Sequence, residues 1–192
     1  YGSLNFGDLL FTEESQINPS SPYSASKAGS DGIALAYAKT YDMNIIVTNC
    51  SNNYGPFQHD EKLIPTLVRK AVNGEPLPIY GTGENIRDWI YVEDHCAALD
   101  AIFHKSGLKG ERFNIGSYNE KTNLEMAEFI LGYLGKSFDL IEMVEDRKGH
   151  DFRYGINSRK LQDTLGWSAK TEFNIGLKKT INWYKEKYDG KF

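Results

Sequence analysis

Stretches of helical and strand-like hydrophobic spacing alternate along this chain. Small and apolar residues recur at helical spacing between about residues 23 and 41, directly after Ser21, a suitable N-cap, and Pro22, a suitable first helical residue. The pattern then changes to a short β-branched run at 44–48, which predicts a buried strand of a parallel sheet. Residues 1–20, rich in Gly, Asn, Asp, Ser and Pro, predict a loop.

The alternation continues and predicts an α/β architecture with a mainly parallel sheet, extended after about residue 56 by a small α/β unit. Residues 49–56 are expected to form a loop at the carboxyl end of a strand, where open α/β sheets place their ligands. Gly81-Thr-Gly83 predicts a turn. The remaining predicted elements are helices at 62–73, 93–104, 123–134, 158–165 and 173–188 and strands at 77–80, 89–92, 112–115 and 140–144.

Composition narrows the classes of function. The net charge of −4 and the isoelectric point near 5.6 argue against a nucleic-acid partner, but leave room for a local phosphate pocket, which Lys62, Arg87 and Arg147 could supply. No apolar run approaches the roughly 20 residues of a membrane helix, so no membrane span is expected.

The two cysteines, Cys50 and Cys96, sit among apolar or small residues without metal-ligand spacing, which favours reduced, buried thiols and no metal site. The first residues have neither the basic nor the apolar region of a secretory signal, so a cytoplasmic location is expected. Tyr1-Gly2 is typical of a strand end entering a loop, which suggests a chain that starts in mid-fold.

Tyr23 and Lys27 place a phenol and an ammonium four residues apart, on one face of the predicted helix. Because a nearby cation favours the phenolate, Tyr23 could exchange a proton with a substrate hydroxyl while Lys27 holds the charge, as in redox chemistry on an alcohol. The alternative is an exposed amphipathic pair. No glycine-rich dinucleotide-binding loop between a strand and a helix accompanies the pair.

Ordered motifs along nearly the whole chain resemble the extended short-chain dehydrogenase/reductases and, among them, the dTDP-glucose 4,6-dehydratase family. The resemblance implies a partial Rossmann-like parallel sheet, with residues 1–56 as the remainder of an NAD-binding domain. Residues 57–192 would mainly form a smaller C-terminal substrate-binding domain, with 86–105 returning to the Rossmann part. The motifs are Ser20-Ser-Pro-Tyr-Ser-Ala-Ser-Lys27, Thr48-Asn-Cys-Ser-Asn-Asn-Tyr-Gly-Pro56, Glu61-Lys-Leu-Ile-Pro65, Leu77-Pro-Ile-Tyr-Gly81, Ile86-Arg-Asp-Trp89, Tyr91-Val-Glu-Asp-His95 and Gly149-His-Asp151.

The resemblance also implies a reaction and a cofactor. In that family bound NAD takes hydride from C4 of the glucosyl unit of dTDP-glucose, water is lost across C5 and C6, and the hydride returns to C6. Tyr23 would be the base at the 4-hydroxyl, Lys27 would contact the nicotinamide ribose, and Asn53 would touch the cofactor. Without the family, Asn52 and Asn53 would be read as a turn that bonds its own backbone.

Substrate contacts follow in the same way. Arg87 can grip a diphosphate oxygen with two donors, whereas the alternative is a salt bridge with Asp88. His150 alone would be read as a surface histidine, and the charges around Asp146 as a solvated loop. The residues that the resemblance assigns to the nucleotide sugar are Asn52, Lys62, Leu63, Pro78, Ile79, Tyr80, Arg87, Asn123, Asp146, Arg147, Lys148, Gly149 and His150.

This chain departs from the family pattern in two ways. Lys148 stands where the family commonly has proline. The family's glycine-rich cofactor loop and its dehydration motif, an Asp-Glu pair directly preceded by a threonine, are not found in the sequence. The carboxylate pairs Glu13-Glu14 and Glu93-Asp94 are rejected as substitutes. We therefore expect no dehydratase activity from this chain without an N-terminal portion, and poor solubility or marginal stability. The full-length form would be a homodimer.

Two other functions stay open at this point. One is a different sugar-nucleotide epimerase or dehydratase of the same superfamily, acting on UDP-, GDP- or CDP-sugars. The other is a non-catalytic sugar-nucleotide-binding remnant. Competition between dTDP and UDP would separate the first from a dTDP enzyme, and activity on complementation would separate the second.

Overall fold

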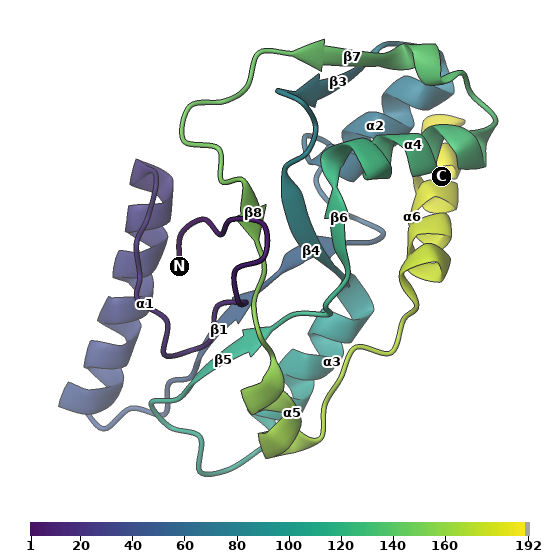
Figure 1. Cartoon of the computed structure of the whole chain (residues 1–192). Coiled ribbons are helices and arrows are strands. Elements are labelled where there is room, and N and C mark those ends of the chain that lie inside the picture. Colours follow the sequence, from purple (N-terminus) through teal and green to yellow (C-terminus); the bar gives the residue numbers. More distant parts are fainter. Residues whose placement is uncertain (191–192) are drawn as a thin grey trace.

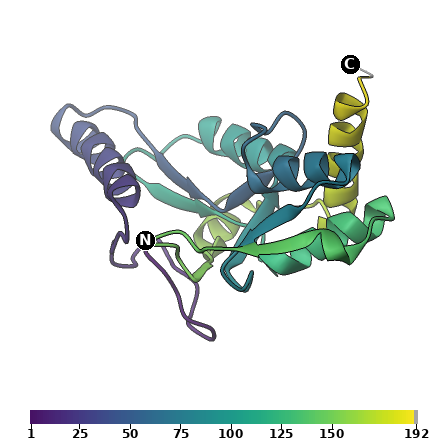
Figure 2. The ribbon, with the colours of Figure 1, turned by 90° about the horizontal axis from the view of Figure 1, so that it is seen from above.

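Helices and strands alternate along the chain and assemble into an α/β fold with short, mostly parallel strand pairs. The structure, a computed structural model, describes residues 1–190. Helices α1 and α6 lie at opposite ends of the molecule (Figures 1 and 2). The helices are α1 (Pro22–Thr40), α2 (Leu63–Asn73), α3 (Val92–Phe103), α4 (Asn123–Leu134), the 3₁₀ turn η1 (Phe138–Leu140), α5 (Arg159–Leu165) and α6 (Phe173–Tyr188).

The strands form three groups. β1 pairs with β5 and β3 with β7, both in parallel, and the central strand β4 pairs in parallel with β2 and β8 and antiparallel with β6. The α/β class with a mainly parallel sheet is therefore confirmed. The strands are β1 (Val47–Cys50), β2 (Asn52–Tyr54), β3 (Leu77–Tyr80), β4 (Ile86–Tyr91), β5 (Arg112–Ile115), β6 (Glu120–Thr122), β7 (Ile141–Val144) and β8 (Arg153–Tyr154).

Local sequence signals explain where the helices begin and end. The Ser21 hydroxyl accepts from the backbone N–H of Ser24, which caps α1 as expected. Thr122 and Glu125 form a complete capping box at the start of α4. Gly74 ends α2 in the left-handed conformation that a residue without Cβ adopts at low cost.

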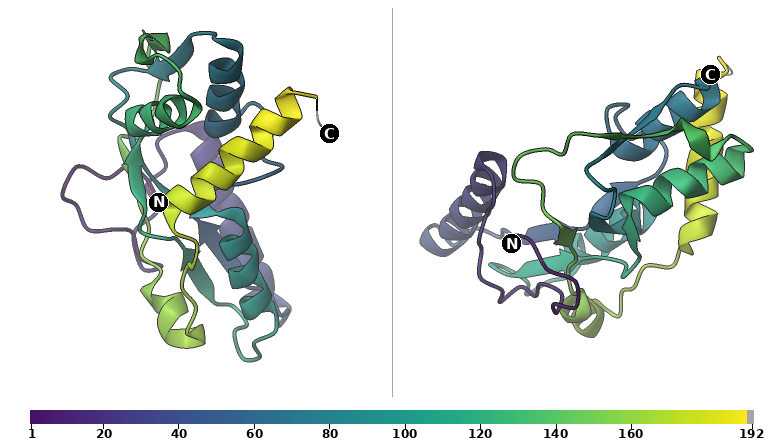
Figure 3. Two further views of the ribbon diagram at one scale, coloured as in Figure 1. Left: turned by 90° about the vertical axis from the view of Figure 1, so that its right-hand side faces the viewer. Right: turned by 45° about the horizontal axis from the view of Figure 1, so that its top comes forward.

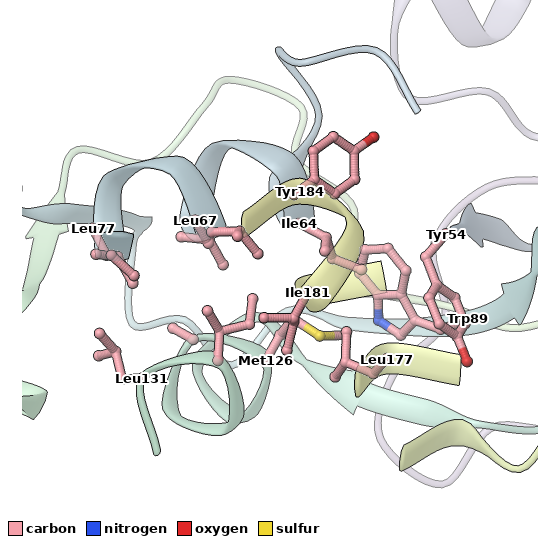
Figure 4. Packing of buried hydrophobic residues seen from close by; sticks show 14 of the residues in the cluster. Tyr54, Ile64, Leu67, Leu77, Trp89, Met126, Leu131, Leu177, Ile181 and Tyr184 are labelled. Atoms are coloured by element: carbon pink, nitrogen blue, oxygen red, sulfur yellow. The ribbon is translucent and has the colours of Figure 1, made fainter. Parts of the chain in front are cut away.

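Two clusters of buried apolar side chains hold the fold together. In the larger cluster, α2, α4 and α6 enclose the space beside β3 and β4, and Leu67, Met126 and Ile181 meet there (Figure 4). The second cluster lies between β1, β5, α3 and α5 and contains Phe113 and Ile115. The division predicted at residue 56 stays a prediction. Strand β2, before residue 56, pairs with β4, which lies in the segment 86–105 assigned to the Rossmann part.

Several element boundaries differ from the sequence prediction. The strand expected at 44–48 lies at 47–50, and the expected loop 49–56 contains β2. The short strands β6 and β8 had no sequence signal, because three and two residues are too few to show a period. Cys50 and Cys96 are both free, but Cys50 is half-buried and Cys96 is exposed, so the expectation of two buried thiols was wrong.

Candidate functional site

A polar pocket of about 420 Å³ opens between α2, β3, β4, the start of α4 and the segment that follows β7. It brings together nine of the residues that the sequence assigned to the nucleotide sugar. Its three cations, Lys62, Arg87 and Arg147, come from three separate segments of the chain, and their role as phosphate contacts stays a prediction. The pocket is lined by Asn52, Glu61, Lys62, Leu63, Thr66, Leu67, Pro78, Tyr80, Arg87, Trp89, Asn123, Arg147 and His150.

Arg87 on β4 is fixed by backbone carbonyls. Its Nη1 donates to the oxygens of Ile86 at 2.7 Å and Phe152 at 3.4 Å, and its Nη2 donates to the oxygen of Asp151 at 2.8 Å. These bonds use three of the five N–H groups of a guanidinium. Within residues 1–190 no group accepts from Nε, and Nη2 makes one bond with its two N–H groups, so two donors are left for an oxyanion.

Burial lowers the pKa of Arg87, but the guanidinium stays charged at neutral pH because its ordinary pKa lies far above it. In the described part of the chain no salt bridge joins Arg87 to Asp88. The Asp88 carboxylate instead accepts from the backbone N–H groups of Ser117 and Asn119, on the opposite face of β4. The alternative of a local Arg–Asp pair was therefore wrong.

The segment after β7 forms a compact polar turn at the edge of the pocket. Asp146 Oδ1 lies 2.7 Å from His150 Nδ1, and His150 Nε2 lies 2.9 Å from Arg147 Nη2. The hydrogen bond from His150 lowers the pKa of Asp146. Arg147 also lies over the ring of Tyr80, 5.2 Å from its centroid. The His150 side chain is 4% exposed, so His150 is not a surface histidine.

The same segment reaches from β7 to the start of α1 (Figure 3). Ser20 Oγ donates to Asp151 Oδ1 at 2.8 Å. Gly149 has a φ of +69°, and a Cβ there would stand 3.2 Å from the Ser20 carbonyl oxygen. The polar pocket and the first turn of α1 are thus connected through residues 149–151.

Tyr23 and Lys27 both lie on the solvent-exposed side of α1, and Tyr23 is 74% exposed. Within residues 1–190 neither the phenol nor the ammonium makes a hydrogen bond or ion pair, so both are available to a ligand. The Lys27 charge also acts on the Cys50 thiol at the end of β1, whose pKa is raised by burial. Neither Tyr23 nor Lys27 lines the polar pocket.

Asn52 and Asn53 point to opposite sides because they are neighbours on a strand. Asn52 lines the polar pocket, whereas the Asn53 side chain faces α3, where its Oδ1 lies 2.8 Å from His95 Nδ1. Asn53 Nδ2 donates to Cys50 Sγ at 3.3 Å and to the Ser51 oxygen at 3.2 Å. Burial lowers the pKa of His95, which favours the neutral imidazole.

Other predicted residues lie near the pocket without lining it. Ile79 is 1% exposed and belongs to the larger core cluster, so it supports the pocket from behind. Asp146, Lys148 and Gly149 are exposed residues of the turn after β7. Among residues 1–190 no group of His, Cys, Asp and Glu is arranged to hold a metal ion, and none of their helices has the length and apolar character needed to cross a membrane.

Four residues that line the pocket were not assigned by sequence: Glu61, Thr66, Leu67 and Trp89. Trp89 lies two positions after Arg87 on β4, so the alternation of a strand could have placed it on the same face. Trp89 is 3% exposed, and within the part of the chain that the structure describes its Nε1 has no hydrogen-bond partner. Glu61 forms a 3.1 Å ion pair with Lys62.

Parallel strands, covering helices and a polar pocket beside the strands define a Rossmann-like α/β protein of the dehydratase/epimerase type. The family model described as GDP-mannose 4,6 dehydratase matches residues 1–180. The chain therefore belongs to this family.

Known relatives agree with this assignment. The chain is 47% identical over 195 residues to a dTDP-glucose 4,6-dehydratase of Neisseria meningitidis, an alignment that covers 96% of this chain and 55% of the relative. The crystal structure of dTDP-glucose 4,6-dehydratase from Bacillus anthracis in complex with NAD matches with a TM-score of 0.92 and 50% identity, over 98% of this chain and 59% of that one. DesIV, a dTDP-glucose 4,6-dehydratase from Streptomyces venezuelae with NAD and TYD bound, matches with a TM-score of 0.94 and 41% identity, over 98% and 58%. The chain thus spans a little over half the length of the relatives it matches.

Proposed function

We propose that this chain carries the nucleotide-sugar pocket and the tyrosine–lysine pair of a dTDP-glucose 4,6-dehydratase. The observation that carries the proposal is the pocket beside β4, which both Arg87, with two N–H groups left for a ligand, and Arg147 line. Two guanidiniums and the Lys62 ammonium suit a diphosphate, since charge-assisted bonds to phosphate oxygens are strong.

The pocket residues take distinct parts in this proposal. Arg87, Arg147 and Lys62 hold the diphosphate, and Pro78 and Tyr80 pack on the thymine and deoxyribose. The remaining residues shape the path of the sugar or support the wall, and are Asn52, Leu63, Ile79, Asn123, Asp146, Lys148, Gly149 and His150.

The residues that would meet NAD lie on α1 and β2. The unpaired phenol of Tyr23, the unpaired ammonium of Lys27 and the carboxamide of Asn53 are groups that suit a nicotinamide riboside. When bound, NAD supplies the oxidation at C4 of the glucosyl unit and the reduction at C6. Tyr23 takes the proton of the 4-hydroxyl, and Lys27 stabilises the phenolate. The proposal assigns no residue of this chain to the proton transfers at C5 and C6.

The remaining parts of the proposal concern organisation. Residues 1–56 would belong to the NAD-binding domain and 57–192 mainly to the nucleotide-sugar-binding domain. The whole protein would act as a homodimer in the cytoplasm. The exposed apolar residues of α1, Ile33 and Tyr37, suit contact with a second copy.

Thermal unfolding with and without saturating dTDP-glucose tests the substrate. A ligand that binds only the folded state stabilises it by RT ln(1 + [L]/Kd), about 2.7 kcal/mol at one hundred times Kd. We expect dTDP-glucose to raise the Tm, and UDP-glucose and GDP-mannose at equal concentration to raise it less. A cooperative melt that no nucleotide sugar shifts would contradict the proposal.

A second candidate is a dehydratase or epimerase for another sugar nucleotide, favoured by the description of the matching family model, which names GDP-mannose. It predicts that the largest shift comes from GDP-mannose or UDP-glucose. A non-catalytic sugar-nucleotide-binding protein predicts a shift with dTDP-glucose but no 4-keto-6-deoxy sugar, even when a complementing cofactor-binding portion is supplied.

A further inference from the structure

His150 makes two hydrogen bonds that together determine its protonation. An arginine can only donate hydrogen bonds, so His150 Nε2, 2.9 Å from Arg147 Nη2, must accept. The ring proton must then sit on Nδ1, which donates to Asp146 Oδ1 at 2.7 Å. The imidazole is therefore neutral, with its proton on Nδ1.

We propose that His150 is a positioning residue that acts on the nucleotide sugar only through Arg147. The inference rests on the proposed function of the pocket, and it changes the part that sequence resemblance gave to His150. Both ring nitrogens are already bonded and the side chain is 4% exposed, so His150 has no donor or acceptor left for a ligand.

Arg147, by contrast, is exposed and long, and such a side chain loses rotamer freedom when a ligand fixes it. Two contacts reduce that loss in advance. His150 Nε2 holds one terminal nitrogen, and the Tyr80 ring lies 5.2 Å below the guanidinium carbon. Asp146 holds the imidazole in the required tautomer, so the order of action runs from Asp146 through His150 to Arg147.

A double-mutant cycle on the 192-residue chain tests this order, with dTDP-glucose affinity measured by calorimetry at pH 8. We expect His150→Ala to weaken binding about fivefold and Arg147→Ala about tenfold or more, since bonds to charged groups are among the stronger ones. The double variant should bind no more weakly than Arg147→Ala alone, because His150 has nothing to position without Arg147.

Two further variants separate positioning from general damage. His150→Gln should recover part of the affinity lost in His150→Ala, since its amide oxygen can accept from Arg147. His104→Gln is the matched control, because His104 is an exposed histidine at the end of α3 and does not line the pocket. It should bind like the unmodified chain. Melting curves of every variant establish that each is folded.

Additive losses in the cycle would overturn the proposal, because they would mean that His150 touches the ligand itself. Nitrogen chemical shifts of the unliganded chain decide the hydrogen-bond pattern independently, with the His150 resonance identified by its loss in His150→Gln. A proton on Nε2 would overturn the proposal whatever the affinities. Absence of dTDP-glucose binding by the unmodified chain would instead defeat the proposed function, and with it the ligand part of this inference, while the tautomer would still be decided.

Discussion

Arg87→Lys tests whether the geometry of one guanidinium, rather than its charge, holds the diphosphate. In the structure three of its N–H groups are bonded to the carbonyls of Ile86, Asp151 and Phe152, and two N–H groups, on Nε and Nη2, remain for a ligand. A lysine keeps the charge but has three donors on a single nitrogen, so it cannot offer two parallel bonds to a phosphate.

The expected loss follows from the bond that disappears. One charge-assisted hydrogen bond contributes about 1.5–3 kcal/mol, which corresponds to about a ten- to hundredfold weaker Kd. Part of this loss comes from the freer backbone at Asp151 and Phe152, which a single ammonium holds less well. We therefore expect Arg87→Lys to weaken dTDP-glucose binding at least tenfold.

Isothermal titration with dTDP-glucose measures the effect, at two salt concentrations so that general charge attraction can be recognised. Arg159→Lys is the matched control, because Arg159 is an exposed arginine on α5 that pairs with Asp163 and does not line the pocket. It should leave the affinity unchanged. Binding by Arg87→Lys within about threefold of the unmodified chain would refute the bidentate geometry, since charge alone would then account for recognition.

Three other predictions concern stability. Arg153→Met should lower the free energy of unfolding by about 2 kcal/mol, because it removes the arginine that makes two hydrogen bonds to the half-buried Glu120 carboxylate. Adding Glu120→Gln to the same chain should recover part of this loss. Urea denaturation measures both effects. Burial holds the pKa of His95 below 6.5, so below that pH the unfolded chain binds more protons than the folded chain, and the free energy of unfolding falls as the pH drops. His95→Gln should reduce the slope of the free energy of unfolding against pH by up to about 1.4 kcal/mol per pH unit. An unchanged slope would contradict the lowered pKa of His95. Gly83→Ala should lower the free energy of unfolding by at least about 1 kcal/mol more than Gly74→Ala. Both glycines have φ near +70°, but only at Gly83 would the new Cβ stand 2.7 Å from a buried methyl group. Equal melting temperatures of the two variants would argue against that packing.

Elements with a full period of hydrophobic spacing could be predicted from the sequence. The helix after Ser21 starts where its cap and proline indicate, and α4 begins at the capping box of Thr122. The loop predicted at 49–56 was wrong for β2, because the polar composition of this region is not typical of a strand. There the chain leaves β5 at Ser51, whose N–H bonds the Ile115 oxygen, and continues beside β4. The strand forms here because it pairs with a segment far away in the sequence, and a local sequence pattern does not predict such pairing.

The site could be predicted in outline but not in its connections. The sequence named nine of the residues that line the pocket through their motifs, and the structure brings Arg87, Arg147 and Lys62 to one space. The sequence could not indicate that Arg87 donates to the carbonyl of Asp151, or that both ring nitrogens of His150 make hydrogen bonds. These bonds depend on the tertiary structure. Sequence patterns identify chemical groups, whereas tertiary contacts determine which of them remain available to a ligand.

The attachment of the pocket to the start of α1 implies thermodynamic linkage. Ala38 is the one buried residue of α1, so this helix depends on a few polar ties, among them the bond from Ser20 to Asp151. A nucleotide sugar that orders residues 146–151 also restrains the turn that carries Tyr23. Coupling between two binding events is reciprocal. If the sugar changes the affinity of α1 for a partner, that partner therefore changes the affinity of the pocket for the sugar by the same factor.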